Sequence, residues 1–122
     1  MTEHQIQAAF IEYCQWMATQ DWRYKNITAV PNGGQRHPAV AMKLKKEGVK
    51  PGYPDVLVDI PNTKHPGLRI EFKKPKGKQS EHQKDWEERL TKAGYLYKVC
   101  YSTDEAIKVL TDYLKDGYKL GR

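Results

Sequence analysis

Two acidic residues and one lysine in the 122-residue sequence have a spacing that could build a catalytic site. Glu71 and Lys73 stand two residues apart in the stretch RIEFKKPKGKQ, residues 69–79. Glu71 is the only negative charge in this stretch, beside five positive ones. Asp55 precedes the apolar run VLVDI. Two neighbouring carboxylates repel each other unless a cation lies between them. Asp and Glu oxygens suit Mg²⁺ or Mn²⁺, and such an ion can polarise a phosphodiester and activate a bound water.

This chemistry requires that two strands bring the three residues together. Residues 55–60 and 68–74 are predicted as strands that pair as an antiparallel hairpin. Side chains alternate along a strand, so Glu71 and Lys73 share one face. Lys73 could then orient a water or stabilise charge in the transition state. The pattern D-x15-E-x-K is loose, however, and a surface ion pair on a solvated strand is the alternative.

The N-terminal part of the chain is predicted to start with a helix over residues 3–18. Thr2 and Gln5 form a capping box before it. Apolar residues then recur at helical spacing, namely Ile6, Phe10, Tyr13, Cys14 and Met17. A short strand is expected at 27–30, a loop at 31–38, and a second short helix that Pro38 begins and Gly48 ends.

The C-terminal part is predicted to contain a helix, a strand and a further helix. Ser80 caps a helix that runs to Ala93, and a strand follows at 95–101. Ser102 and Glu105 form a capping box for the last helix, which carries Ala106, Leu110 and Leu114 on one face. The strand–helix–strand step fits a right-handed parallel crossover. The fold class is therefore α/β, with a mixed β-sheet flanked by helices.

Composition limits the partners and the cellular location. A net charge of +6 and a pI of about 9.3 favour a polyanionic partner such as nucleic acid. Cys14 and Cys100 lack the spacing of a zinc site and are expected to be small buried residues in a reducing compartment. No apolar run approaches the ~20 residues of a membrane span. We expect one domain over residues 1–122, soluble and cytoplasmic, with no membrane partner.

Several spaced motifs resemble those of one family. PNGGQR, GVKPGYPD, IEFKKPKGKQSEHQ and AGY follow one another as in the VRR-NUC (virus-type replication–repair nuclease) family of the PD-(D/E)xK superfamily. The resemblance extends from about residue 3 to about residue 107. It implies a restriction-endonuclease-like core and a Mg²⁺- or Mn²⁺-dependent endodeoxyribonuclease. It also implies that Asp55 and Glu71 bind the metal and that Lys73 completes the active site.

The resemblance suggests further site residues, each with a structural alternative. Glu3 matches a metal-binding glutamate at the start of the first helix, where it could merely stabilise the helix dipole. The backbone carbonyl of Phe72 is implied as another ligand. Gln83 matches a catalytic glutamine, although it can also form a capping box with Ser80. Glu12 is the second choice for the role of Glu3, and Gln79 is the second choice for the role of Gln83.

The nucleic-acid partner is expected to be DNA. The candidate DNA-binding residues are basic side chains around the proposed site, namely Arg36, Lys50, Lys74, Lys76 and Lys78. The resemblance favours a homodimer that cuts branched DNA such as Holliday junctions. A nuclease of flap or linear duplex DNA and a non-catalytic DNA-binding module are the alternatives. Trp16, Trp22 and Tyr24 could form the dimer surface, although core packing is favoured for each.

Overall fold

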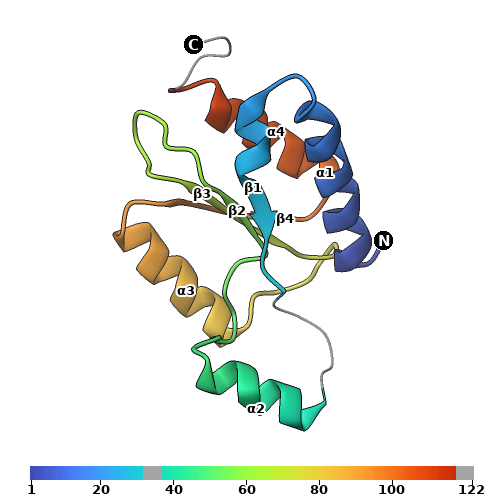
Figure 1. Cartoon of the computed structure of the whole chain (residues 1–122), viewed down its shortest axis with the longest axis vertical. Helices are drawn as coiled ribbons and strands as arrows, with labels where there is room; N and C mark the ends of the chain where they lie inside the picture. The colour runs from blue at the N-terminus through green and yellow to red at the C-terminus, as the bar shows by residue number, and fades with distance from the viewer. Residues whose placement is uncertain (32–36, 118–122) are drawn as a thin grey trace.

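A mixed four-stranded sheet forms the centre of the part of the chain that the computed structural model describes, residues 1–31 and 37–117 (Figure 1). The strand order is β1-β2-β3-β4. β1 pairs with β2 and β2 with β3 in antiparallel fashion, whereas β3 and β4 are parallel. The predicted hairpin and the parallel crossover are both confirmed. The strands are β1 Ile27–Ala29, β2 Val56–Val58, β3 Leu68–Phe72 and β4 Leu96–Cys100.

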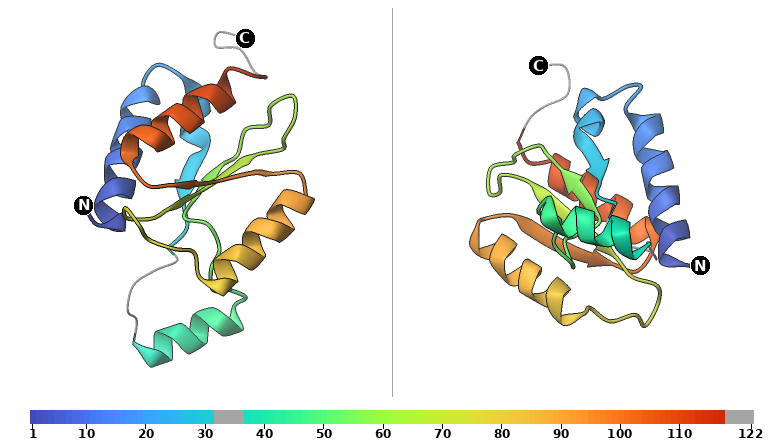
Figure 2. Two further views of the ribbon diagram at one scale, coloured as in Figure 1. Left: turned by 180° about the vertical axis from the view of Figure 1, so that it is seen from behind. Right: turned by 60° about the horizontal axis from the view of Figure 1, so that its bottom comes forward.

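Helices cover both faces of the sheet, as Figure 2 shows. α1 and α4 lie together on one face and α3 lies on the other, while α2 stands apart at one end. The α/β class and the sheet flanked by helices are thus confirmed. In the described residues, no helix has the length and apolar character needed to cross a membrane. The helices are α1 Glu3–Met17, α2 Pro38–Lys46, α3 Glu81–Lys92 and α4 Thr103–Leu114, with a 3₁₀ helix over Trp22–Asn26.

Hydrogen bonds at the helix starts explain where the helices begin. Thr2 and Gln5 form the expected reciprocal capping box of α1, and Ser80 and Gln83 form that of α3. The side chain of Ser102 accepts from the Glu105 amide, so it caps α4 as expected. The prediction of a full capping box is wrong, because Oε1 of Glu105 accepts from the amide of Tyr101 at 2.6 Å and not from that of Ser102. Tyr101 is thereby held at the end of β4.

The two faces of the sheet differ in polarity because side chains alternate along each strand. Ile70 and Phe72 point into the apolar core, where the ring of Phe72 lies 5.5 Å from that of Phe10 on α1. Arg69, Glu71 and Lys73 occupy the opposite face, and all three are buried. The face that α3 covers is therefore polar, and the proposed site residues lie on it.

Several expectations about burial and strand length need correction. β2 is shorter than the predicted 55–60, and Asp55 lies just before its first residue. Trp16 and Trp22 are 65% and 43% exposed, so core packing was the wrong expectation for both. Tyr24 is buried, as expected, and packs edge-on against Tyr13. Cys14 and Cys100 are both free and buried, which confirms their expected structural role.

Candidate active site

Asp55 and Glu71 lie opposite each other at the paired ends of β2 and β3. Val56 pairs with Ile70, so the next residues outward in the antiparallel register are Asp55 and Glu71. The carboxylate of Asp55 crosses to the other strand, where its Oδ2 accepts from the amide of Phe72 at 2.7 Å. The sequence-predicted strand pairing is therefore correct, and it places two carboxylates in one patch.

The turn before Asp55 is attached to α3. Gly52 has φ +84°, and a Cβ atom there would lie 2.6 Å from Cβ of His82 in the first turn of α3. The indole N–H of Trp86 donates to the carbonyl of Pro51 at 3.0 Å. The ring of Tyr53 packs edge-on against that indole at 4.8 Å. Only glycine combines this backbone angle with so close an approach, so the PGYPD turn fixes Asp55 relative to α3.

Glu71 is fully buried, and its two carboxylate oxygens have different surroundings. Oε1 accepts from the hydroxyl of Tyr97 on β4 and from the amide of Gln79 at 3.4 Å. Oε2 receives no hydrogen bond from the described residues. The ammonium of Lys73 lies 3.8 Å from Oε2, which is an ion-pair distance. The ion pair with Lys73 offsets part of the cost of burying this oxygen without a hydrogen bond, and a metal ion or substrate group could offset more.

The electrostatics of the patch raise the pKa of Asp55 to about 6. Burial is the largest cause, since it disfavours the charged form. The negative charges of Glu71 and Glu3 raise the pKa further, whereas the hydrogen bond from Phe72 and the charge of Lys73 lower it. Glu3 on α1 is therefore close enough to act electrostatically on Asp55. Strongly shifted carboxyl groups of this kind are concentrated at functional sites.

The donor set fits a divalent cation in part. Asp55 and Glu71 supply hard carboxylate oxygens, and Oε2 of Glu71 is buried without a hydrogen bond from a described residue. Across residues 1–31 and 37–117, no three His, Cys, Asp or Glu side chains are grouped so that they could hold a metal ion. The roles of Glu3 and of the Phe72 carbonyl as additional ligands stay predictions.

The glutamine that contacts Glu71 is Gln79. Gln83 Oε1 instead accepts from the amide of Ser80 at 2.8 Å, so the described contacts of this side chain are those of a helix cap. A catalytic role for Gln83 stays a prediction without a supporting contact to the two carboxylates. Sequence reasoning missed Tyr97 and Glu87. The register of β3 and β4 puts Tyr97 on the same face of the sheet as Glu71. Alternation within the predicted strand 95–101 groups Tyr97 with Val99 but does not fix that register.

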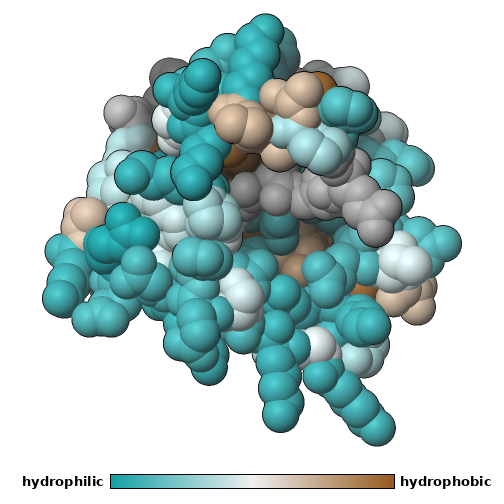
Figure 3. All heavy atoms as spheres, turned by 90° about the horizontal axis from the view of Figure 1, so that it is seen from below, coloured by the Kyte–Doolittle hydropathy of each residue, from teal (hydrophilic) through white to brown (hydrophobic). Residues whose placement is uncertain are grey.

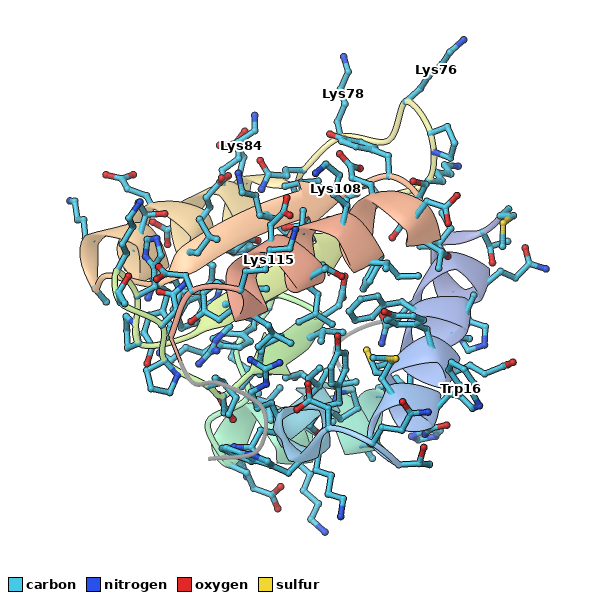
Figure 4. All side chains as sticks on the ribbon, turned by 90° about the horizontal axis from the view of Figure 1, so that it is seen from above. Trp16, Lys76, Lys78, Lys84, Lys108 and Lys115 are labelled. Carbon is cyan, nitrogen blue, oxygen red and sulfur yellow. The ribbon has the colours of Figure 1, made fainter. Side chains whose placement is uncertain are left out.

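The candidate DNA-binding lysines lie in the two segments that flank the site residues along the chain, one before Asp55 and three after Lys73. The four lysines 50, 74, 76 and 78 are all exposed. The surface seen from below in Figure 3 is mostly hydrophilic. Lys76 and Lys78 extend away from the body of the protein in Figure 4. Arg36 lies outside the described residues. These positions suit phosphate contacts, but a role in DNA binding stays a prediction for each residue.

Comparisons with known proteins agree on one family. The model of the VRR-NUC domain matches residues 1–104. A solved structure described as a VRR_NUC domain protein is 33% identical in sequence, and the alignment covers 96% of this chain and 91% of that one. Its backbone superposes with a TM-score of 0.80. No curated protein sequence matches the chain.

Proposed function

Because the chain belongs to the VRR-NUC domain family of nucleases, we propose that it is a divalent-metal-dependent endonuclease that hydrolyses phosphodiester bonds in DNA. The observation that carries this proposal is the patch formed by Asp55, Glu71 and Lys73 at the ends of two paired strands. Glu71 is fully buried, and its Oε2 receives no hydrogen bond from the described residues but lies 3.8 Å from the ammonium of Lys73. Glu71 is well explained as a ligand.

Asp55 and Glu71 would hold the metal, with Glu3 and the carbonyl of Phe72 as further ligands. A bound Mg²⁺ or Mn²⁺ would polarise the scissile phosphodiester and lower the pKa of the attacking water. Asp55 must be ionised to act as a ligand, and a pKa of about 6 means that it is largely ionised at neutral pH. The backbone amide of Phe72 donates to Oδ2 of Asp55 and so holds the carboxylate in one orientation.

Lys73 would orient the attacking water and stabilise negative charge at the phosphorus. Its ammonium is nearly buried beside Glu71, where charge interactions are stronger than in bulk water. Water attacks phosphorus and gives up a proton to solvent, the bond from phosphorus to the 3′ oxygen breaks, and the leaving 3′ oxygen takes a proton from solvent. The products then carry 5′-phosphate and 3′-hydroxyl ends. The exposed lysines after β3 would neutralise phosphates of the strand that approaches the patch.

The preferred substrate is branched DNA, such as a Holliday junction, and the active form is a homodimer. Two sites related by a two-fold axis suit a four-way junction. Trp16 and Trp22 supply exposed aromatic surface for an interface, and Figure 4 shows Trp16 on the outer side of α1. Light scattering tests the assembly, and a monomeric mass at micromolar concentration would contradict a stable dimer.

Cleavage of a panel of labelled DNAs tests the activity. Junction, fork, flap and linear duplex substrates are incubated with Mg²⁺, Mn²⁺ or EDTA, and the product ends are mapped. We expect metal-dependent cutting that is fastest on the junction and is lost in Glu71→Ala. Binding without products under every metal condition would instead identify a DNA-binding module. Equal cutting of the duplex and the junction would contradict the proposed preference for branched DNA.

A further inference from the structure

The carboxylate of Glu71 is held at one oxygen and open at the other. Both hydrogen bonds that it accepts from described residues end on Oε1, one from Tyr97 and one from Gln79. Oε2 is the atom that faces Lys73 and lacks a hydrogen bond from the described chain. We infer that Tyr97 and Gln79 are positioning residues that fix the Glu71 carboxylate and direct Oε2 toward the metal, an inference that rests on the proposed function.

The position of Tyr97 follows from the parallel pairing of β3 and β4. Tyr97 is the register partner of Arg69, and Glu71 is the partner of Val99. Tyr97 therefore lies on the same face of the sheet as Glu71, one pleat back along the neighbouring strand. The side chain is buried, and its long phenol brings the hydroxyl to Oε1. Burial and the bond to Glu71 raise the pKa of Tyr97, so the hydroxyl remains a donor at physiological pH.

Gln79 connects the same oxygen to α3. Its amide nitrogen lies 3.4 Å from Oε1 of Glu71 and 3.0 Å from Oε1 of Glu87. A side-chain amide has two hydrogens, so one nitrogen can serve both carboxylates. Gln79 thus lies between two acidic groups and donates to each. Glu71 is thereby fixed by Tyr97 from β4 and by Gln79 from the segment just before α3.

A fixed carboxylate matters because the last torsion of glutamate is broad and roughly two-fold. Without donors on Oε1, rotation would present either oxygen to the ligand site in several orientations. Two donors on Oε1 leave Oε2 in one place, which reduces the reorganisation needed when a metal binds. Loss of an outer-shell partner of a metal ligand typically costs about 10–100-fold in affinity or activity.

Tyr97→Phe tests the inference because it removes only the hydroxyl. Tyr113→Phe is the matched control. Tyr113 lies on α4, is also buried, and donates from its hydroxyl to the carbonyl of Ile60 at 2.7 Å. Mn²⁺ affinity is measured by calorimetry without DNA, and thermal stability is measured in EDTA. We expect Tyr97→Phe to weaken Mn²⁺ binding about 10–100-fold. The control should retain the affinity of the wild-type protein while losing similar stability.

Gln79→Ala provides a second test if Tyr97→Phe does not fold. Gln79 is only half-buried, so its loss removes little packing. Gln15→Ala is its control, because Gln15 is an exposed glutamine on α1 to which no role in the site is assigned. We expect weaker Mn²⁺ binding in Gln79→Ala alone. Wild-type affinity in Tyr97→Phe, or in Gln79→Ala if that is the variant that folds, would overturn the positioning role. A wild-type protein that cuts no DNA with any metal would instead overturn the proposed function.

Discussion

Oδ2 of Asp55 accepts a 2.7 Å hydrogen bond from the backbone amide of Phe72, the residue that follows Glu71. One carboxylate of the patch is thus attached to the strand that carries the other. The bond lies just beyond the last β2–β3 pair, Val56 and Ile70, where Asp55 and Glu71 are the next opposed residues. Asp55 therefore closes the hairpin end and contributes to the site with the same side chain.

Asp55→Asn should stabilise the metal-free protein at pH 8. The pKa of Asp55 rises from 3.8 to about 6 on folding, so the folded state binds protons more tightly. Stability therefore falls as pH rises from about 4 to about 6, and the full cost persists at pH 8. At ~1.4 kcal/mol per pKa unit, the gain in Asp55→Asn is at most about 3 kcal/mol.

Urea unfolding in EDTA measures this difference. Asparagine keeps a carbonyl oxygen that can accept from Phe72, so the hydrogen bond need not be lost. The gain in the free energy of unfolding of Asp55→Asn should be large at pH 8 and should disappear near pH 4. Nuclease activity of this variant should be lost at both pH values. A variant less stable than the wild-type protein at pH 8 would show that the charge of Asp55 is not a destabilising feature.

Gly52→Ala should reduce both stability and activity. The new methyl group would meet the backbone and Cβ of His82, and φ is +84°. Gly48→Ala is the matched control, because Gly48 has φ +100° but open space around it. The left-handed angle alone costs about 1–2 kcal/mol. We expect Gly48→Ala to lose about this amount and Gly52→Ala to lose clearly more in thermal unfolding.

The activity of the two glycine variants separates two roles of the turn. If the attachment of the turn to α3 positions Asp55, Gly52→Ala should cut DNA more slowly even at a temperature where both variants are folded. Equal activity and equal melting temperatures would mean that the turn tolerates displacement from α3.

Lys73→Ala and Lys74→Ala should have different effects, although the two lysines are adjacent in sequence. Lys73 is buried beside Glu71, whereas Lys74 is exposed. Loss of a preorganised charge in an active site typically lowers kcat by about 10²–10³-fold, which we expect for Lys73→Ala. Lys74→Ala should change DNA affinity and leave kcat within a few-fold. Single-turnover kinetics at saturating enzyme concentration distinguish the two, and equal rate losses would contradict the role of Lys73.

The loop lysines should contribute to the salt dependence of DNA binding. Each lost phosphate contact reduces the slope of log K against log salt by about 0.9 for duplex DNA. We expect a reduction of up to about 2 in Lys76→Ala/Lys78→Ala, measured with the catalytically inactive Glu71→Ala background. Lys108→Ala/Lys115→Ala removes the same charge from α4 and its C-cap residue, on the face of the sheet opposite α3, and should leave the slope unchanged. Equal reductions would indicate non-specific attraction by net charge.

Sequence patterns predicted most of the fold because its elements have strong local signals. Capping boxes marked α1 and α3, and glycines with positive φ end α2 and α3. The 3₁₀ helix at Trp22–Asn26 has the N-cap Asp21, whose side chain accepts from the amide of Arg23, but its five residues are too few for a helical periodicity. Exposure of Trp16 was missed because an aromatic residue next to a buried stripe is ambiguous without a partner surface. Average preference then favours burial.

The site was predictable as far as strand alternation and pairing extend. These rules placed Glu71 with Lys73 and brought Asp55 to the neighbouring strand. They do not choose between Gln79 and Gln83, because that choice depends on how the loop enters α3 and which side chain the cap uses. The contact from Tyr97 depends on the exact register of β3 and β4, which the sequence alone does not determine.

All described contacts of the Glu71 carboxylate come from one continuous piece of chain, residues 68–100, while Asp55 belongs to the other arm of the hairpin. A chain cut in the turn between β2 and β3 would therefore place the two carboxylates on separate fragments. Neither fragment could form the pair alone. Recovery of nuclease activity on mixing would then report that the two fragments had reassembled.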